Sequence, residues 1–325
     1  MDMPISKILI LVEFFYLLPS IGIGYWLFGK DEKLSGGAKV ALTLYFSLVT
    51  IPWVATSLAL DFGLLIRLGI LMHLVMIVTL IFIYPLWKWF RNLKLGLPKT
   101  NDVLMIVVGA CAATVYALIH TRSELLFQLY SWIVRDDAYC FYLVIFKAMA
   151  APGLPIQEHL KEVAAIITTP GNVPYPATAI VLFKKFGMQA MHAAFAAVLA
   201  VFAYLSAQRL LKNPLYGLLA AAAVILNPYL LSVPVLDRNL IALATSSVIF
   251  YLLIAGAGRP IALGLLLGLV SGMGLRFLPS LMVIPVLLAL YWRGQLKPKP
   301  LIFLALGFLI TFSTVSYTHL RAHET

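Results

Sequence analysis

The feature that most constrains this fold is a series of long apolar segments that carry almost no charge. Each is close to the roughly 20 residues with which a helix crosses a bilayer. Charged residues make up only 11% of the chain, too few to build the polar surface of a soluble protein of this size. The runs lack the alternating polarity of barrel strands. The sequence therefore predicts an all-α, polytopic transmembrane helical bundle. The ten predicted spans are 8–29, 40–60, 68–87, 103–119, 187–208, 214–236, 239–257, 260–275, 277–292 and 300–314.

The basic residues indicate how these spans are oriented. If the N-terminus lies outside and the chain alternates sides, the inside loops hold 13 Lys and Arg residues and the short outside segments hold four. Loops rich in Lys and Arg stay on the cytoplasmic side. We therefore expect an integral protein of the cell (plasma) membrane, with its N-terminus and segment 120–186 extracytoplasmic. The net charge of +11 is divided among short loops, which favours the lipid bilayer, and not nucleic acid, as the partner.

Segment 120–186 is long, and its pattern predicts helices that lie along the membrane surface. The stretches Leu125–Val134 and Ala138–Ala150 are apolar but too short or too amphipathic to span, which is typical of interfacial helices. The sequence "TTPGNVPYP" predicts a loop, and "ATAIVLFKKFG" a half-buried helix that leads into the next span. Further along, Asn227-Pro228 predicts a kink in the span 214–236.

The last eleven residues, "VSYTHLRAHET" (315–325), break with the apolar helix before them. They resemble the translation of a sequencing adapter, so we interpret 315–325 as a non-native tail and leave its histidines out of functional reasoning. The natural protein is then expected to continue past residue 314, and this fragment to be inactive or unstable by itself. The remaining chain divides into an N-terminal three-helix extension, 1–102, and a truncated transmembrane core, 103–314, that includes the loop 120–186.

Several stretches of this core resemble a known superfamily. These are "RDDAYCFY", the "PYP" loop at 174–176, "FG" at 186–187, "ILNPYLLSVPVLDRNL" and the hairpin "ALGLLLGLVSGMGLRFLPSLMVIPVLL". Together they resemble the polyprenyl-phosphate-sugar-dependent glycosyltransferases of the GT-C superfamily, in particular the dolichyl-phosphate-mannose–protein mannosyltransferase-like branch (glycosyltransferase family 39-like). The likeness covers about 120–292. The extension 1–102 departs from it, because the family places its acidic loop after the first span and here that loop follows the fourth.

The resemblance implies a GT-C-like fold and an activity in protein glycosylation or a related transfer. A hexosyl group would pass from a lipid-linked sugar, which acts as co-substrate, to a protein, lipid or glycan acceptor on the extracytoplasmic face. Transfer would proceed by direct inverting attack. Carried onto this sequence, the catalytic acids are Asp136 and Asp137. The residues implied in substrate binding are Arg135, Tyr139, Tyr142, Asp237, Arg238 and Arg276.

The residues themselves suit this chemistry. Glycosyl transfer needs a base that takes a proton from the acceptor hydroxyl, and positive charge that stabilises the departing lipid phosphate. A partly desolvated carboxylate is a better base because its pKa is raised. We favour Asp136 as the base, and the reverse assignment stays open. So does a divalent metal ion, Mg or Mn, held by Asp136, Asp137 and Asp237. An aspartate at a helix start is, however, usually only a cap.

Two other functions stay open. A secondary transporter or flippase would use ionisable groups inside the bundle, for which Glu13, His73 and Arg276 are the candidates. Transporters usually show repeated halves, and no internal repeat is visible in this sequence. The catalytic subunit of an oligosaccharyltransferase belongs to the same superfamily, and its acceptor-reading domain would lie beyond residue 314.

Overall fold

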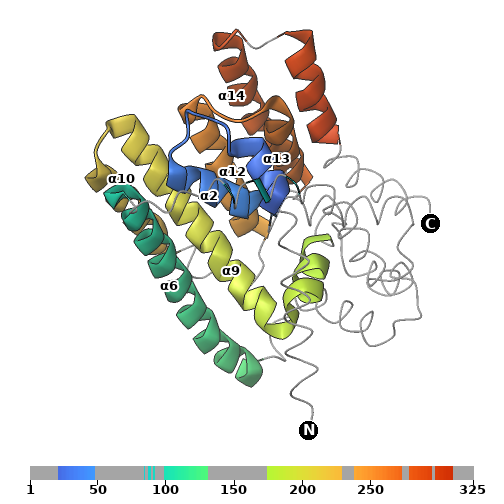
Figure 1. Ribbon diagram of the computed structural model, residues 1–325. Coiled ribbons are helices and arrows are strands. Elements are labelled where there is room, and N and C mark those ends of the chain that lie inside the picture. The colour runs from blue at the N-terminus through green and yellow to red at the C-terminus, as the bar shows by residue number, and fades with distance from the viewer. Residues whose placement is uncertain are drawn as a thin grey trace, which may run out of the picture.

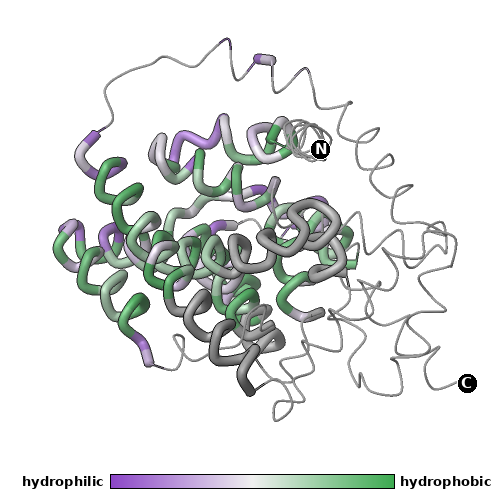
Figure 2. Tube along the Cα trace, turned by 90° about the horizontal axis from the view of Figure 1, so that it is seen from below, coloured by the Kyte–Doolittle hydropathy of each residue, from purple (hydrophilic) through white to green (hydrophobic). Residues whose placement is uncertain are grey.

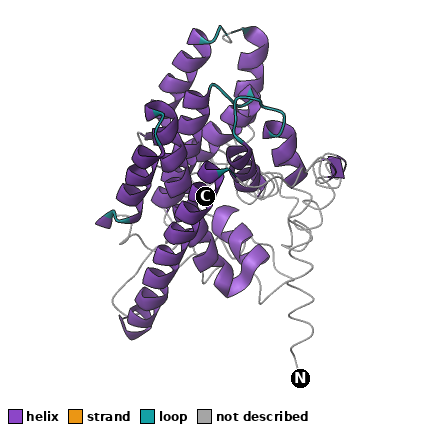
Figure 3. Cartoon of the chain, turned by 60° about the vertical axis from the view of Figure 1, so that its left-hand side comes forward, coloured by secondary structure: helices purple, strands orange, loops and turns teal. Residues whose placement is uncertain are grey.

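The structure is a computed structural model that describes residues 21–47, 84, 87, 88, 91, 99–130, 174–228, 238–272, 278–294 and 297–309. Within these ranges the chain is helical or forms short turns, and it contains no strand (Figure 3). The all-helical prediction is confirmed for this part of the chain.

Nine helices or helical segments matter for the argument. Seven of them are α2 (Gly36–Tyr45), α6 (Thr100–Tyr130), α9 (Pro174–Leu211), α10 (Pro214–Ile225), α12 (Arg238–Ala255), α13 (Pro260–Gly272) and α14 (Leu278–Trp292). One further helix, residues 21–28, precedes α2. Another, Pro298–Leu309, follows α14.

The helix ends form where the local sequence favours them. Ser35 caps α2, because its Oγ accepts the backbone N–H of Ala38 at 3.3 Å. Asn213 caps α10 in the same way through Leu215 N–H at 2.9 Å, and Pro214 occupies the first helical position, where its missing N–H costs nothing. At the end of α12, Gly256 adopts a φ of 66°, a left-handed conformation that suits glycine.

Helix α9 is the central element of the bundle. It packs along α6, α10 and α12, and Figure 1 shows its yellow second part running between α6 and α12. Its lime-green first part is turned back relative to that second part (Figure 1). Gly187 is the one glycine in α9 and lacks the side chain that would stiffen the helix there.

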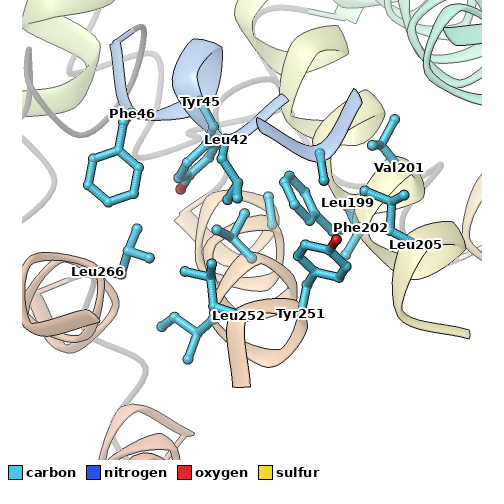
Figure 4. Close-up of a cluster of buried hydrophobic side chains, with 14 of the residues drawn as sticks. Leu42, Tyr45, Phe46, Leu199, Val201, Phe202, Leu205, Tyr251, Leu252 and Leu266 are labelled. Carbon is cyan, nitrogen blue, oxygen red and sulfur yellow. The ribbon is translucent and has the colours of Figure 1, made fainter. Parts of the chain in front are cut away.

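One hydrophobic core joins the helices, and the chain before α6 contributes to it. Phe28, Leu42 and Phe46 are completely buried in the same cluster as side chains of α9, α12 and α13. The rings of Phe28 and Phe46 meet edge to face, with centroids 4.8 Å apart. Figure 4 shows Leu42, Tyr45 and Phe46 beside side chains of α9, α12 and α13. The described part of the predicted extension is therefore packed against the predicted core.

Glycines allow two helix pairs to approach closely. A Cβ on Gly264 of α13 would collide with the backbone of Leu304, and a Cβ on Gly307 would collide with that of Ile261. A Cβ on Gly24, in the helix 21–28, would lie 2.6 Å from the carbonyl oxygen of Thr43 in α2. Close contacts of this kind between backbones are how helices associate when small residues face each other.

The helices flanking the predicted extracytoplasmic loop are longer than the sequence pattern indicated. Helix α6 continues without a break to Tyr130, so the predicted loop start at 120 and the separate helix at Leu125 are wrong, because no residue between 118 and 130 breaks the helix. Helix α9 begins at Pro174, so the segment 174–176 opens a helix and is not a loop. Prolines are tolerated in the first turn, where the N–H groups have no partner within the helix.

The predicted span 214–236 is also interrupted. Helix α10 ends at Ile225, and the N–H of Asn227 bonds to the carbonyl of Val224 at 3.3 Å, which tightens the last turn. Pro228 disfavours the helical conformation at the residue before it. Asn227-Pro228 therefore follows the end of a 12-residue helix and does not merely kink a long one.

By length and composition, two helices could cross a membrane, Thr100–Leu118 and Ala193–Leu211. Four shorter apolar helices accompany them, Pro214–Ile225, Leu240–Ala255, Pro260–Ser271 and Pro298–Leu309. Hydrophobic residues run along the helices, and the hydrophilic ones gather at their ends and turns (Figure 2).

Candidate functional site

The predicted site residues lie almost entirely outside the described residues. This holds for Arg135, Asp136, Asp137, Tyr139, Tyr142, Asp237 and Arg276, and also for Glu13 and His73. Arg238 is the first residue of α12, but its side chain belongs to the same undescribed set. The described chain therefore gives the positions of the helix ends that flank the predicted site, and it holds a different polar centre.

That centre is one end of the bundle, where five turns meet. It comprises residues 29–37, 99–102, 209–215, 255–260, 292–294 and 297–299, and we call it the basic end. Hydrogen bonds connect the turns: Lys33 to Gly256, Arg209 to Lys33, Arg293 to Leu253, and Gly37 to Asp102. These are the turns in which the sequence concentrates its Lys and Arg residues. Lys33, Arg209, Arg259 and Arg293, which the charge pattern assigned to inside loops, therefore lie at one end of the described helices.

Three cations of the basic end bind the last carbonyl groups of α12. Lys33 Nζ donates to the carbonyl of Gly256 at 2.9 Å, Arg209 Nη2 donates to that of Ala255 at 3.2 Å, and Arg293 Nη2 donates to that of Leu253. The carbonyl end of a helix carries partial negative charge, and each cation placed there contributes about 0.3–1 kcal/mol at exposed positions. We call these three residues the α12 clamp.

The turn that ends α12 explains why its carbonyls are available to the clamp. The N–H of Ala257 bonds to the carbonyl of Leu252, and that of Gly256 to the carbonyl of Leu253, at 3.0 and 3.2 Å. This pair of bonds is a Schellman motif, which requires the left-handed residue that Gly256 supplies. The carbonyls of Ala255 and Gly256 have no following turn of helix to bond to, so the cations take that place.

Two carboxylates of the basic end, those of Asp31 and Asp102, accept hydrogen bonds from backbone N–H groups. Asp31 accepts the N–H of Lys33 through Oδ1 at 3.1 Å and the N–H of Gly258 through Oδ2 at 3.0 Å. Asp102 Oδ1 accepts the N–H of Gly37 at 3.1 Å. Asp31 thus links the turn before α2 to the turn after α12, and Asp102 links α6 to α2. Both act as structural acceptors.

Arg293 is the least exposed member of the clamp. Partial burial lowers the pKa of its guanidinium from the ordinary value, and the nearby carboxylate of Asp31 opposes that shift. An arginine side chain titrates so far above neutrality that it stays charged through such a change. Arg293 therefore brings a permanent positive charge to the carbonyl end of α12.

The exposed tryptophans and tyrosines of the described chain lie close to basic residues in the sequence. Trp26, Tyr84, Trp87, Tyr216, Tyr291 and Trp292 are the exposed Trp and Tyr residues of the described chain. Each lies within four residues of a Lys or Arg in the sequence. The guanidinium of Arg259 sits over the Trp26 ring, 4.4 Å from its centroid, at the distance of a cation–π contact. The other large hydrophobic side chains that are exposed in the described chain are aliphatic or phenylalanine.

One polar pair lies in the interior, away from either end. The hydroxyls of Tyr45 and Thr245 are 2.6 Å apart and buried, and Thr245 also bonds back to the carbonyl of Ile241 at 2.7 Å. The pair joins α2 to α12 within the apolar core. Its hydroxyls are satisfied, as buried polar groups must be.

Sequence reasoning placed the basic loops on one side but missed what the individual cations do. Lys33, Arg209 and Arg293 look like ordinary loop residues in the sequence. A usable signal was Gly256, since a glycine after an apolar helix predicts a C-terminal cap whose carbonyls attract cations. Another was the recurrence of Trp or Tyr beside Lys or Arg at the ends of the apolar runs.

No family model, no curated protein and no solved structure matches the chain. Among the described side chains there is also no group of three or more His, Cys, Asp and Glu that could hold a metal ion. The predicted metal ligands lie outside that set, so the metal hypothesis stays a prediction. The functional argument thus depends on the described helices and on the sequence of the loop they flank.

Proposed function

We propose that the chain is a multi-pass membrane glycosyltransferase that moves a sugar from a polyprenyl-phosphate donor to an acceptor on the extracytoplasmic face. The observation that carries the proposal is the acid pair Asp136-Asp137, in a segment that resembles the GT-C superfamily. The segment follows α6 in the sequence.

Support for the membrane placement comes from the exposed surface of the helices. Ile106 and Val107 of α6, Ile284 and Leu288 of α14, and Ile302 are all more than 45% exposed. Soluble monomers rarely present such apolar faces on several helices. Lipid accommodates these faces, and the Trp and Tyr residues beside the basic turns match the aromatic belts at membrane–water interfaces.

Support for the sidedness comes from the direction of the helices. Helix α6 begins at the basic end, where Asp102 binds Gly37, and extends for 31 residues, about 46 Å at helical rise. Its last residue, Tyr130, therefore lies far from the basic end, and so does Arg238 at the start of α12. With the basic end cytoplasmic, segment 131–173 leaves the bundle on the extracytoplasmic side, where a flipped lipid-linked donor presents its sugar.

In the proposed reaction Asp136 accepts the proton of the acceptor hydroxyl as its oxygen attacks the anomeric carbon. The glycosidic carbon–oxygen bond breaks, and the lipid phosphate leaves with the electron pair. Arg238 and Arg276 are the cations proposed to stabilise that phosphate, and Tyr139 and Tyr142 are proposed to pack on the sugar. The neighbouring carboxylate of Asp137 disfavours a second negative charge, so it raises the pKa of one of the two acids and makes that acid a stronger base. A divalent ion between the acids would instead stabilise the leaving group.

The test uses the natural full-length protein in membranes supplied with radiolabelled polyprenyl-phosphate sugars. Asp136→Asn and Asp137→Asn are compared with Glu158→Gln, which removes one negative charge from the same segment. We expect transfer to fall by about 10²–10⁴-fold in the variant that lacks the base, with Glu158→Gln near wild type. Expression and solubility in detergent should be the same for all three.

Two results would contradict the proposal. Wild-type transfer in both aspartate variants removes the catalytic role of the pair. Substrate uptake into proteoliposomes that depends on an ion gradient, without any glycosylated product, supports the transporter alternative instead. If the product is a glycosylated sequon peptide made from a lipid-linked oligosaccharide, the chain belongs to the oligosaccharyltransferase type.

A further inference from the structure

Seven of the lysines and arginines of the basic end fall into two groups. The clamp residues Lys33, Arg209 and Arg293 donate to the carbonyls that end α12. A second group extends into the surroundings: Lys30, Lys212, Lys297 and Lys299 are all exposed. We call these four the outer lysines. A count of loop charges does not distinguish the two groups, whereas the hydrogen bonds do.

The outer lysines add positive charge to an end that already has an excess of it. The described basic end holds nine Lys and Arg residues against the three acids Asp31, Glu32 and Asp102. Both oxygens of Asp31 already accept hydrogen bonds from Lys33 and Gly258. Like charges that gather on one surface repel each other and attract anions.

The position of the outer lysines identifies the anion. Lys30 follows the exposed Trp26 by four residues, Lys212 precedes the exposed Tyr216 by four, and Lys297 lies five residues after Trp292. Trp and Tyr at such places lie at the level of lipid headgroups. A lysine one turn further out reaches the headgroup phosphates with its flexible stem.

We propose that the outer lysines bind the headgroups of anionic phospholipids in the cytoplasmic leaflet. Trp26, Tyr216 and Trp292 lie at the glycerol level just below these headgroups. The clamp residues do not take part, because their charges already bind α12. The inference rests on the membrane placement proposed above and is independent of glycosyl transfer.

The expected strength follows from membrane electrostatics. Each Lys near an anionic surface strengthens binding by about fivefold at physiological salt. The four together should raise the preference for anionic over zwitterionic lipid by at least about 100-fold. The attraction should disappear in 1 M salt, where charges are screened beyond about 3 Å.

The experiment compares the full-length wild type with a variant in which all four outer lysines are changed to Gln, and with a matched variant in which all four are changed to Arg. Each protein is purified in detergent and titrated with phosphatidylglycerol or phosphatidylcholine. The midpoint of thermal unfolding and the retained lipid in native mass spectrometry are recorded. We expect phosphatidylglycerol to stabilise the wild type and the Arg variant equally. The Gln variant should need at least tenfold more of this lipid while unfolding at the wild-type temperature in phosphatidylcholine.

Three outcomes overturn the proposal. The first is a Gln variant that behaves like the wild type in phosphatidylglycerol. The second is equal stabilisation of the wild type by both lipids, and the third is protection by soluble glycerophosphoglycerol as strong as that by the intact lipid. The last outcome would identify a site for a soluble anion. Resistance of the protein to alkaline extraction from membranes, measured separately, distinguishes a failure of this proposal from a failure of the membrane placement.

Discussion

The two ends of the bundle use their charged residues in different ways. At the basic end, Asp31 has both oxygens bonded to backbone N–H groups, and the three clamp cations bind backbone carbonyls. Charges with such partners hold turns together. The sequence holds its acid pair, Asp136-Asp137, in the segment that follows α6, beside aromatic residues, and the role proposed for this pair is catalytic.

This difference teaches how to separate structural from catalytic acids in an apolar chain. Acidic residues are scarce, because the chain holds only 13 Asp and Glu residues. We therefore look for a structural or a chemical role for each of them. An acid that accepts two backbone N–H groups has a structural reason that accounts for it completely. A general base needs an oxygen that reaches the substrate proton. The comparison therefore predicts opposite effects for the same change at the two ends.

The largest effect concerns Asp31→Asn against Asp136→Asn in the full-length protein. Asp31→Asn should leave the transfer rate per folded molecule at the wild-type value, while Asp136→Asn should lower it by about 10²–10⁴-fold. Initial rates of sugar transfer, normalised to folded protein from size-exclusion chromatography, measure both. Equal losses of rate in the two variants would show that the ends are not functionally distinct.

A smaller effect is expected from Gly256→Ala at the basic end. The φ of 66° at Gly256 suits glycine. A residue with a Cβ in this left-handed conformation lowers the stability of the fold by about 1–2 kcal/mol. The control is Gly36→Ala, because a Cβ on Gly36 meets no atom within 4 Å and alanine is the better helix former. The free energy of unfolding in mixed micelles should fall for the first variant and stay level or rise for the second.

The sequence predicted the helical class, because the length and composition of an apolar run are local properties. It misplaced the starts and ends of helices near residues 120, 174 and 226, where a few polar or proline residues do not decide whether a helix continues. Pro174 was interpreted as a loop residue, but proline is common in the first turn of a helix, where its missing N–H has no helical partner to lose. Pairings such as Arg293 with Leu253, 40 residues apart, depend on tertiary packing, which no local pattern records.

The contribution of the clamp itself can be measured at Arg293. Arg293→Met removes the charge but keeps a side chain that fills the space, and we expect a loss of about 1 kcal/mol. A fully buried hydrogen bond to a charged group contributes more stability than that. Arg293 is partly exposed, and the carbonyl of Leu253 keeps the hydrogen bond that it accepts from the N–H of Gly256, so the expected loss is smaller. Arg293→Lys, which retains the charge, should recover part of the loss. Unfolding titrations at low and high salt give both values.

The smallest expected effect serves as a neutral reference for the charged ends. Tyr45 and Thr245 share a buried hydrogen bond between two uncharged hydroxyls, and such pairs between membrane helices couple by about 0.6 kcal/mol on average. A double-mutant cycle with Tyr45→Phe, Thr245→Val and both together isolates that coupling. Because neither group is charged, the coupling should be the same in low and high salt, whereas the loss in Arg293→Met should shrink as salt rises. A salt-dependent Tyr45–Thr245 coupling would mean that the interior shares the electrostatics of the basic end.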